Sequence, residues 1–181
     1  MVPRMALATQ LPSRREVIAE ARTRGQRVAA VLPYHYPRAL LRAHGFHPIE
    51  LWGPPHVPRD LGSRHFPAYT CDIVVRATSF LLQGGLDGVD AILVPHTCDA
   101  LQGMGSVLGD FLRPRPAVLT LYLPRGQRTE DRVFLADELR RLGSALAGLS
   151  GVAPDAAAWE DAFAAEASAD SALASLYQRR S

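Results

Sequence analysis

"VLPYHYPRALLRAHGFHPIELWGPP", residues 31–55, passes from a strand end through a turn and a helix into a second strand. The segment "RVAAVL", residues 27–32, is expected to be a short buried strand. A turn over residues 34–37 follows it, with Pro37 at the start of a helix. The helix "RALLRAH" closes at Gly45, and "HPIELWG" returns as a strand. We therefore predict a βαβ unit with parallel strands and a right-handed crossover.

The alternation of strands and helices continues on both sides of this unit. Ser13, followed three positions on by Glu16, predicts a capped helix over residues 13–24 that ends at Gly25. Four prolines and two glycines among residues 53–68 predict a loop. Helical spacing and apolar runs predict further helices over 71–83, 98–112, 128–149 and 155–180, and further strands over 90–94 and 116–124.

This order of elements is typical of a parallel sheet with helices on both faces. We expect an α/β fold, a Rossmann-like sheet of about four parallel strands with additional C-terminal helices. The expected divisions are an N-terminal helix (residues 1–25), an α/β domain (residues 26–150) and a C-terminal helix (residues 151–181). Ligands of such sheets bind beyond the carboxyl ends of the strands, which is where the 34–37 turn and Cys98 are expected.

Composition narrows the function classes. Hydrophobic residues make up 48% of the chain and charged residues 21%, as in a globular protein. All 20 basic residues are arginines, they are scattered, and the net charge is only +2, which argues against a nucleic-acid partner. No apolar run is long enough to span a membrane, and no signal peptide is expected. We expect a cytoplasmic protein without a membrane partner, in which thiols stay reduced.

The chain has two cysteines, and each is expected at the start of a helix. Cys71 stands at or just before one first turn, and Cys98 opens the next helix. The partial positive charge of a helix N-terminus favours the thiolate, which is the form that binds metal. The two thiolates could converge on a soft metal centre, form a redox pair, or be small core residues. No CxxC is present, and the 27-position separation excludes the common local zinc and ferredoxin patterns.

Several other positions carry weaker expectations. Ser79 is expected as a mid-helix surface hydroxyl, Thr97 and Thr129 as helix caps, and Asp99 as support for the first turn of its helix. Gly103 and Gly105 fall inside a predicted helix, where they could admit a ligand or another backbone. The remaining expectations concern His44, His47, His56 and His65 on the surface or in loops, and an apolar helix face of Phe134, Leu135, Leu139, Leu142 and Leu146. Walker, HExxH and GxSxG motifs are absent, so ATPase, zincin and α/β-hydrolase functions have no support.

Four segments together resemble the 2-hydroxyacyl-CoA dehydratase and benzoyl-CoA reductase family. "YHYPRALLRAHGFHPIEL" resembles its opening signature, and "YTCDIVV" places Cys71 at a helix start as the family does. "DAILVPHTCDAL" runs a buried strand into Thr-Cys-Asp, and "VLTLYLP" followed by "FLADELRRLGSALAGLSG" matches the next strand and helix. The resemblance covers about residues 27–178.

The resemblance implies a subunit of an iron–sulfur hydro-lyase acting on acyl-CoA. Family members bind a [4Fe-4S] cluster through cysteines in each of two related subunits, and an ATP-dependent iron–sulfur activator donates an electron. The electron passes to the thioester carbonyl of a 2-hydroxyacyl-CoA, giving a ketyl radical anion from which hydroxide leaves. The reductase branch reduces an aromatic acyl-CoA instead. By this resemblance Cys71 and Cys98 match the first two cluster ligands, whereas no catalytic residue is assigned.

The chain departs from the family at the third ligand. Family subunits carry a third cysteine in a second α/β half, to which this sequence does not extend. The chain could be a fragment, receive the ligand from a partner, or be a shortened relative that serves as a non-catalytic partner-binding domain. His96 is a candidate third ligand, against the alternative of a loop histidine bonded to backbone. Tyr34, His35 and Tyr36 are candidates for substrate or cluster-edge contact, against ordinary turn packing. As alternatives to the roles given above, Thr97 and Ser79 could donate hydrogen bonds to a thioester carbonyl or to cluster sulfur, and Asp99 could hydrogen-bond to the cluster.

Overall fold

The computed structural model describes residues 12–52 and 56–179, and these form a four-stranded parallel sheet. The strands are β1 (Arg27–Val31), β2 (Phe46–Glu50), β3 (Ala91–His96) and β4 (Ala117–Tyr122), in the order β2-β1-β3-β4. The helices are α1 (Arg14–Thr23), α2 (Arg38–Ala43), α3 (Asp60–Ser63), α4 (Asp72–Leu82), α5 (Asp99–Ser106), α6 (Thr129–Ser150) and α7 (Ala156–Gln178). The expected α/β fold with a parallel sheet is therefore confirmed.

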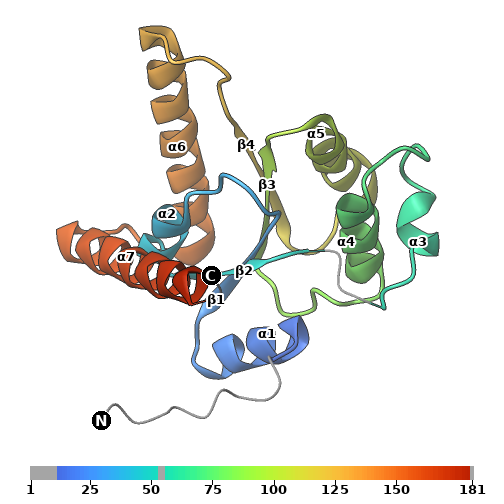
Figure 1. The fold of residues 1–181 in the computed structure, drawn as a ribbon, viewed down its shortest axis with the longest axis horizontal. Helices are drawn as coiled ribbons and strands as arrows, with labels where there is room; N and C mark the ends of the chain where they lie inside the picture. Colours follow the sequence, from blue (N-terminus) through green and yellow to red (C-terminus); the bar gives the residue numbers. More distant parts are fainter. Residues whose placement is uncertain (1–11, 53–55, 180–181) are drawn as a thin grey trace.

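Helices cover both faces of the sheet (Figure 1). Val28 and Ala30 of β1 face a core built with α1, α4 and α5, whereas Ala29 and Val31 face a second core built with α2 and α6. Because successive side chains of a strand point to opposite faces, a central strand must be apolar throughout to bury both. The continuous run "VAAVL" of residues 28–32 meets this requirement, and so does the run "AILV" in β3.

The βαβ unit predicted from residues 27–53 is present. β1 pairs with β2 in parallel, α2 connects them, and Gly45 takes a φ of 79° where the helix turns back into the strand. A side chain rarely adopts that φ, which explains the glycine. At α1, Ser13 and Glu16 form the predicted capping box.

Three local expectations are wrong. The 53–68 segment contains the short helix α3, although residues 53–55 lie outside the described part. The N-cap of α6 is Arg128, whose backbone N–H donates to Asp131 at 2.9 Å, and Thr129 is already helical. The helix expected over 98–112 is α5 followed by a π-helical segment, η1 (Val107–Leu112), which ends where Arg113 takes a φ of 41° just before a proline.

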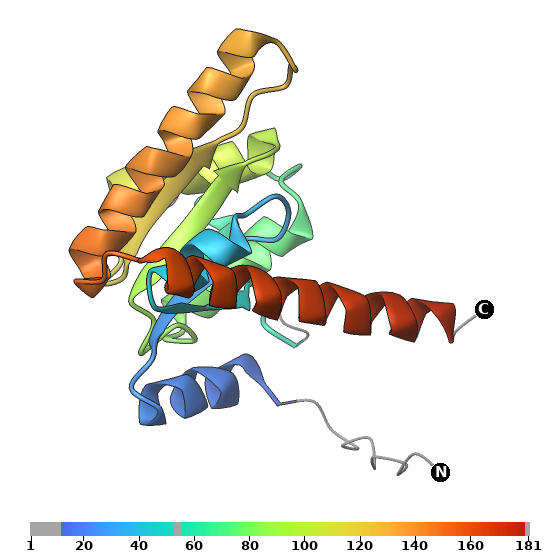
Figure 2. The ribbon, with the colours of Figure 1, turned by 90° about the vertical axis from the view of Figure 1, so that its left-hand side faces the viewer.

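The two C-terminal helices extend beyond the sheet (Figures 1 and 2). Leu142 and Leu146 of α6 are buried as predicted, but Phe134 near its start is 46% exposed because the first turns of α6 lie outside the packed layer. Trp159 of α7 packs on the core formed with α2 and α6. The proposed division into residues 1–25, 26–150 and 151–181 stays a prediction. None of the described helices is long and apolar enough to cross a membrane.

Candidate functional site at the carboxyl edge of the sheet

The strand order identifies one place on the sheet edge where a ligand is expected. The chain runs from β1 outward to β2, and β3 then lies on the opposite side of β1. In such doubly wound sheets the crevice beyond the carboxyl ends of the two central strands is the usual binding place. The fold therefore predicts a ligand between residues 33–37, which follow β1, and residues 96–98, which complete and follow β3.

The two cysteines meet at this edge. Cys71 is the N-cap of α4 and Cys98 is the N-cap of α5, and neither side chain caps its helix by a hydrogen bond. Both thiols are free and exposed, so neither cysteine is a core residue. Both line one cavity of about 490 Å³. The cavity is completed by Phe66, Pro67, Tyr69, Thr70, Asp99, Ala100 and Gly103. The structure thus brings together two residues that the sequence placed at separate helix starts, with their convergence as one of three possibilities.

The donor set of this cavity fits part of an iron–sulfur cluster. Two thiols at helix N-termini have the chemistry and charge environment that thiolate ligands need. Within residues 12–52 and 56–179, however, no group of three His, Cys, Asp or Glu side chains is placed to hold a metal ion. The described residues therefore offer two thiols at this cavity and no third donor close enough to share a metal ion with them.

His96 lies at the carboxyl end of β3 but is not part of the cavity lining. Its ring packs edge-on against Tyr122 with centroids 4.3 Å apart, and a Cβ built on Gly105 would come within 2.8 Å of Nε2. Both ring nitrogens are shielded and find no hydrogen-bond partner in the described part of the chain, so the expected bond to backbone is absent. Burial lowers the pKa of His96, against an opposing contribution from the Glu138 carboxylate.

The turn after β1 has an unusual backbone. Tyr34 and His35 have φ values of 81° and 53°, each a conformation that costs a non-glycine residue about 1–3 kcal/mol. Both residues are exposed, and the Tyr34 ring packs edge-on against Trp52 at 5.7 Å. Such strain persists only where neighbouring contacts hold it, and it gathers at functional sites.

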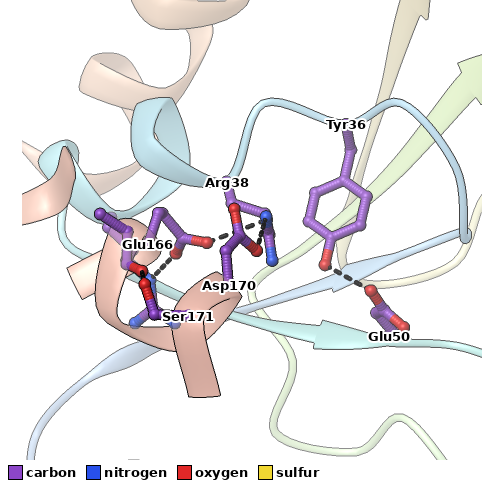
Figure 3. A network of polar contacts seen from close by, with 8 residues as sticks. Tyr36, Arg38, Glu50, Glu166, Asp170 and Ser171 are labelled. Carbon is purple, nitrogen blue, oxygen red and sulfur yellow. Dashed lines mark hydrogen bonds and ion pairs between the residues drawn. The ribbon is translucent and has the colours of Figure 1, made fainter. Parts of the chain in front are cut away.

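A hydrogen bond from Tyr36 joins this turn to Glu50 at the end of β2. The Tyr36 hydroxyl donates to Glu50 Oε1 at 2.8 Å, and Trp52 Nε1 donates to the other carboxylate oxygen at 2.9 Å (Figure 3 shows the Tyr36 contact). Burial, followed by the hydrogen bond to Glu50, raises the pKa of Tyr36 well above its ordinary value. Glu50 and Trp52 were not predicted from the sequence, although a charged residue at the carboxyl end of a strand is a signal that could have identified Glu50.

Three expectations about isolated polar residues are corrected. Ser79 is buried, not at the surface, because α3 packs on α4 and the Ser79 hydroxyl accepts the Gly62 backbone N–H at 2.8 Å. His44 is buried because it caps α2 beneath α6 and α7, with Nδ1 2.8 Å from the Leu40 carbonyl oxygen. Cys98, rather than Thr97, is the N-cap of α5. His56 and His65 are exposed as expected, and His47 is half-buried.

Comparison with known proteins gives a consistent result. Residues 33–181 match the family model described as 2-hydroxyglutaryl-CoA dehydratase, D-component. The beta subunit of (R)-2-hydroxyglutaryl-CoA dehydratase from Acidaminococcus fermentans is 27% identical over 62% of this chain and 30% of its own length. The beta subunit of (R)-phenyllactyl-CoA dehydratase from Clostridium sporogenes is 28% identical over 45% of this chain and 21% of its own length. The lactoyl-CoA dehydratase beta subunit of Anaerotignum propionicum is 22% identical over 77% of this chain and 37% of its own length. The matches therefore span well under half the length of each of these three relatives.

Proposed function

The chain belongs to the 2-hydroxyglutaryl-CoA dehydratase D-component family, and we propose that it is part of a subunit of a 2-hydroxyacyl-CoA dehydratase, a hydro-lyase. The observation that carries this proposal is the convergence of Cys71 and Cys98, both free, on one cavity at the carboxyl edge of the sheet. The named relatives are all dehydratase beta subunits, which favours elimination of water over reduction of an aromatic acyl-CoA.

Cys71 and Cys98 would hold the cofactor as two thiolate ligands. A [4Fe-4S] cluster, when bound, supplies one-electron chemistry toward the thioester of the substrate. The N-termini of α4 and α5 direct partial positive charge at both sulfurs, which stabilises their anionic form. A third ligand would come from outside the described residues, for example from the related subunit. His96 could contribute only if its ring left its place over Gly105.

The β1–α2 turn would contact the acyl-CoA. Tyr34 and His35 are exposed there, and Tyr36 is held in place by Glu50, so this segment presents a fixed edge to the crevice. The crevice between this turn and residues 96–98 is where the strand order predicts a ligand. The role proposed for the three residues is binding and orientation of substrate rather than proton transfer.

A second candidate is a partner-binding domain without a cluster. It is favoured by the lack of a third metal donor among the described residues. In this alternative the chain still associates with a related dehydratase subunit, but both cysteines are dispensable.

Reconstitution distinguishes the two candidates. The chain is combined anaerobically with a related dehydratase subunit and an ATP-dependent activator, and enoyl-CoA formation is followed with 2-hydroxyglutaryl-, phenyllactyl- and lactoyl-CoA. Cys71→Ser and Cys98→Ser should each abolish turnover without preventing assembly, whereas Ser106→Ala on the exposed side of α5 should retain it. Equal turnover in the cysteine variants, or an assembled complex that turns over none of the three substrates, would contradict the dehydratase proposal.

A further inference from the structure

We infer that Glu166 of α7 is a positioning residue that fixes the β1–α2 turn, residues 33–37, by acting through Arg38. The inference rests on the proposed function only for what the turn would bind. The conformation of the turn and the contacts that hold it are properties of this chain alone.

The β1–α2 turn needs support from its surroundings. Tyr34 and His35 both have positive φ, and such backbone persists only where the neighbouring structure enforces it. Packing gives little support on the α7 side, where a cavity of about 480 Å³ lies against Tyr36, Pro37 and Arg38. That cavity is bounded on its other sides by apolar residues of α6 and α7, among them Leu139, Trp159 and Phe163. Besides the packing of Tyr34 on Trp52, polar contacts at the α2 end of the turn provide the restraint.

The first restraint joins the turn to the sheet. Tyr36 donates its hydroxyl to Glu50 at the carboxyl end of β2. This hydrogen bond holds the turn at Tyr36, two residues before the first residue of α2.

The second restraint joins the turn to α7. Arg38, the first residue of α2, forms an ion pair through Nε with Glu166 at 2.9 Å and donates a hydrogen bond from a terminal nitrogen to Asp170 at 2.7 Å (Figure 3). Glu166 also binds Arg42, one helical turn along α2, so a single carboxylate spans two arginines on the same face. The Glu166 side chain is 11% exposed, whereas the Asp170 side chain is 59% exposed. Solvent screening weakens the Asp170 contact far more, so Glu166 carries the restraint.

The test uses nuclear magnetic resonance on the full chain and needs neither cluster nor substrate. A residue with positive φ has a short distance between its own amide and Hα protons, so its intraresidue NOE is strong. Glu166→Gln should weaken this NOE at Tyr34 and His35, corresponding to about a tenfold shift of the turn equilibrium, or ~1.4 kcal/mol. Asp170→Asn is the matched control on the same arginine and should leave both NOEs unchanged.

A second pair of variants establishes the route of the effect. If Glu166 acts through Arg38, Glu166→Gln should have no further effect in an Arg38→Gln background but keep its full effect in an Arg42→Gln background. The Trp159 indole resonance, which reports α7 docking, should stay in place in Glu166→Gln. Unchanged NOEs at Tyr34 and His35 would overturn the inference. Loss of the docked Trp159 resonance would overturn it too, because Glu166 would then hold α7 rather than the turn. Neither result depends on whether the chain binds a cluster or acts on acyl-CoA.

Discussion

Two glycines of α5 that are two positions apart have opposite surroundings. A Cβ built on Gly103 meets nothing within 4 Å, whereas one built on Gly105 would lie 2.8 Å from His96 Nε2. Since alanine is a better helix former, Gly103→Ala should raise the free energy of unfolding by about 1 kcal/mol. Gly105→Ala should lower it by about 1–3 kcal/mol, because the His96 ring must move. Chemical denaturation of both variants measures these changes. Equal changes in the free energy of unfolding for the two variants would contradict the packing of His96 over α5.

His47 predicts a dependence of stability on pH. Burial, together with the positive charges of Arg42 and Arg24, lowers the pKa of His47 in the folded chain. The unfolded chain, in which the pKa is about 6.5, therefore takes up this proton first as the pH falls. Since the unfolded state binds more protons, the free energy of unfolding decreases as the pH falls below that value.

This dependence is tested by measuring the free energy of unfolding against pH for two histidine variants. His47→Gln should flatten the dependence of the free energy of unfolding between about pH 7 and pH 5. His65→Gln, at an exposed position, should preserve it. If the two variants give the same slope, the buried environment of His47 is not the cause.

At the residue scale, what could be predicted depended on how local the determinant was. The position of Cys98 at a helix start followed from the strand before it and the helical spacing after it. The environment of His96 could not be predicted, because it is created by Gly105 on another element and by Tyr122 on a neighbouring strand. Glu166 was missed for the same reason, since its partners Arg38 and Arg42 are more than a hundred positions away.

At the element scale, adjacent residues of α4 give opposite predictions. Ser79 and Thr78 are both fully buried, but only Ser79 has a partner, the Gly62 N–H of α3. Ser79→Ala leaves that donor unsatisfied and should lower the free energy of unfolding by about 1–3 kcal/mol. Thr78 Oγ1 has no partner in the described part of the chain, so Thr78→Val should leave stability unchanged or raise it by about 1 kcal/mol.

Chemical denaturation of Ser79→Ala and Thr78→Val measures both changes in the free energy of unfolding. The two variants bear on the site because Cys71 is the N-cap of the same helix, α4. If Thr78→Val lowered the free energy of unfolding more than Ser79→Ala did, this would contradict the packing of α4 against α3 through the Gly62–Ser79 hydrogen bond. The packing of α3 against α4 could not be predicted from the sequence. Residues 53–68 contain the prolines and glycines of a loop, and the four-residue helix α3 within them is stabilised by contact with α4 rather than by its own sequence.

At the scale of the whole molecule, the sheet was the most predictable feature and the site the least. Short apolar runs and the alternation of elements specify a parallel sheet with covered faces, and the structure has it. The strand order then places the β1–α2 turn and Cys98 at one edge. That Cys71 joins the same cavity depends on how α4 packs beside α5, which follows from the three-dimensional fold and not from any local pattern. The family resemblance supplied that pairing before the geometry did.

The central claim is that Cys71 and Cys98 act together as ligands of one iron–sulfur cluster. Anaerobic determination of iron and sulfide, with a visible spectrum, tests it most directly on the chain assembled with a related dehydratase subunit. We predict that the chain contributes a site for about four irons and that both Cys71→Ser and Cys98→Ser lose them. His96→Gln should retain them, because its ring lies outside the cavity. Iron content that is unchanged by either cysteine substitution, or an assembled complex in which this chain adds no iron, would contradict the claim.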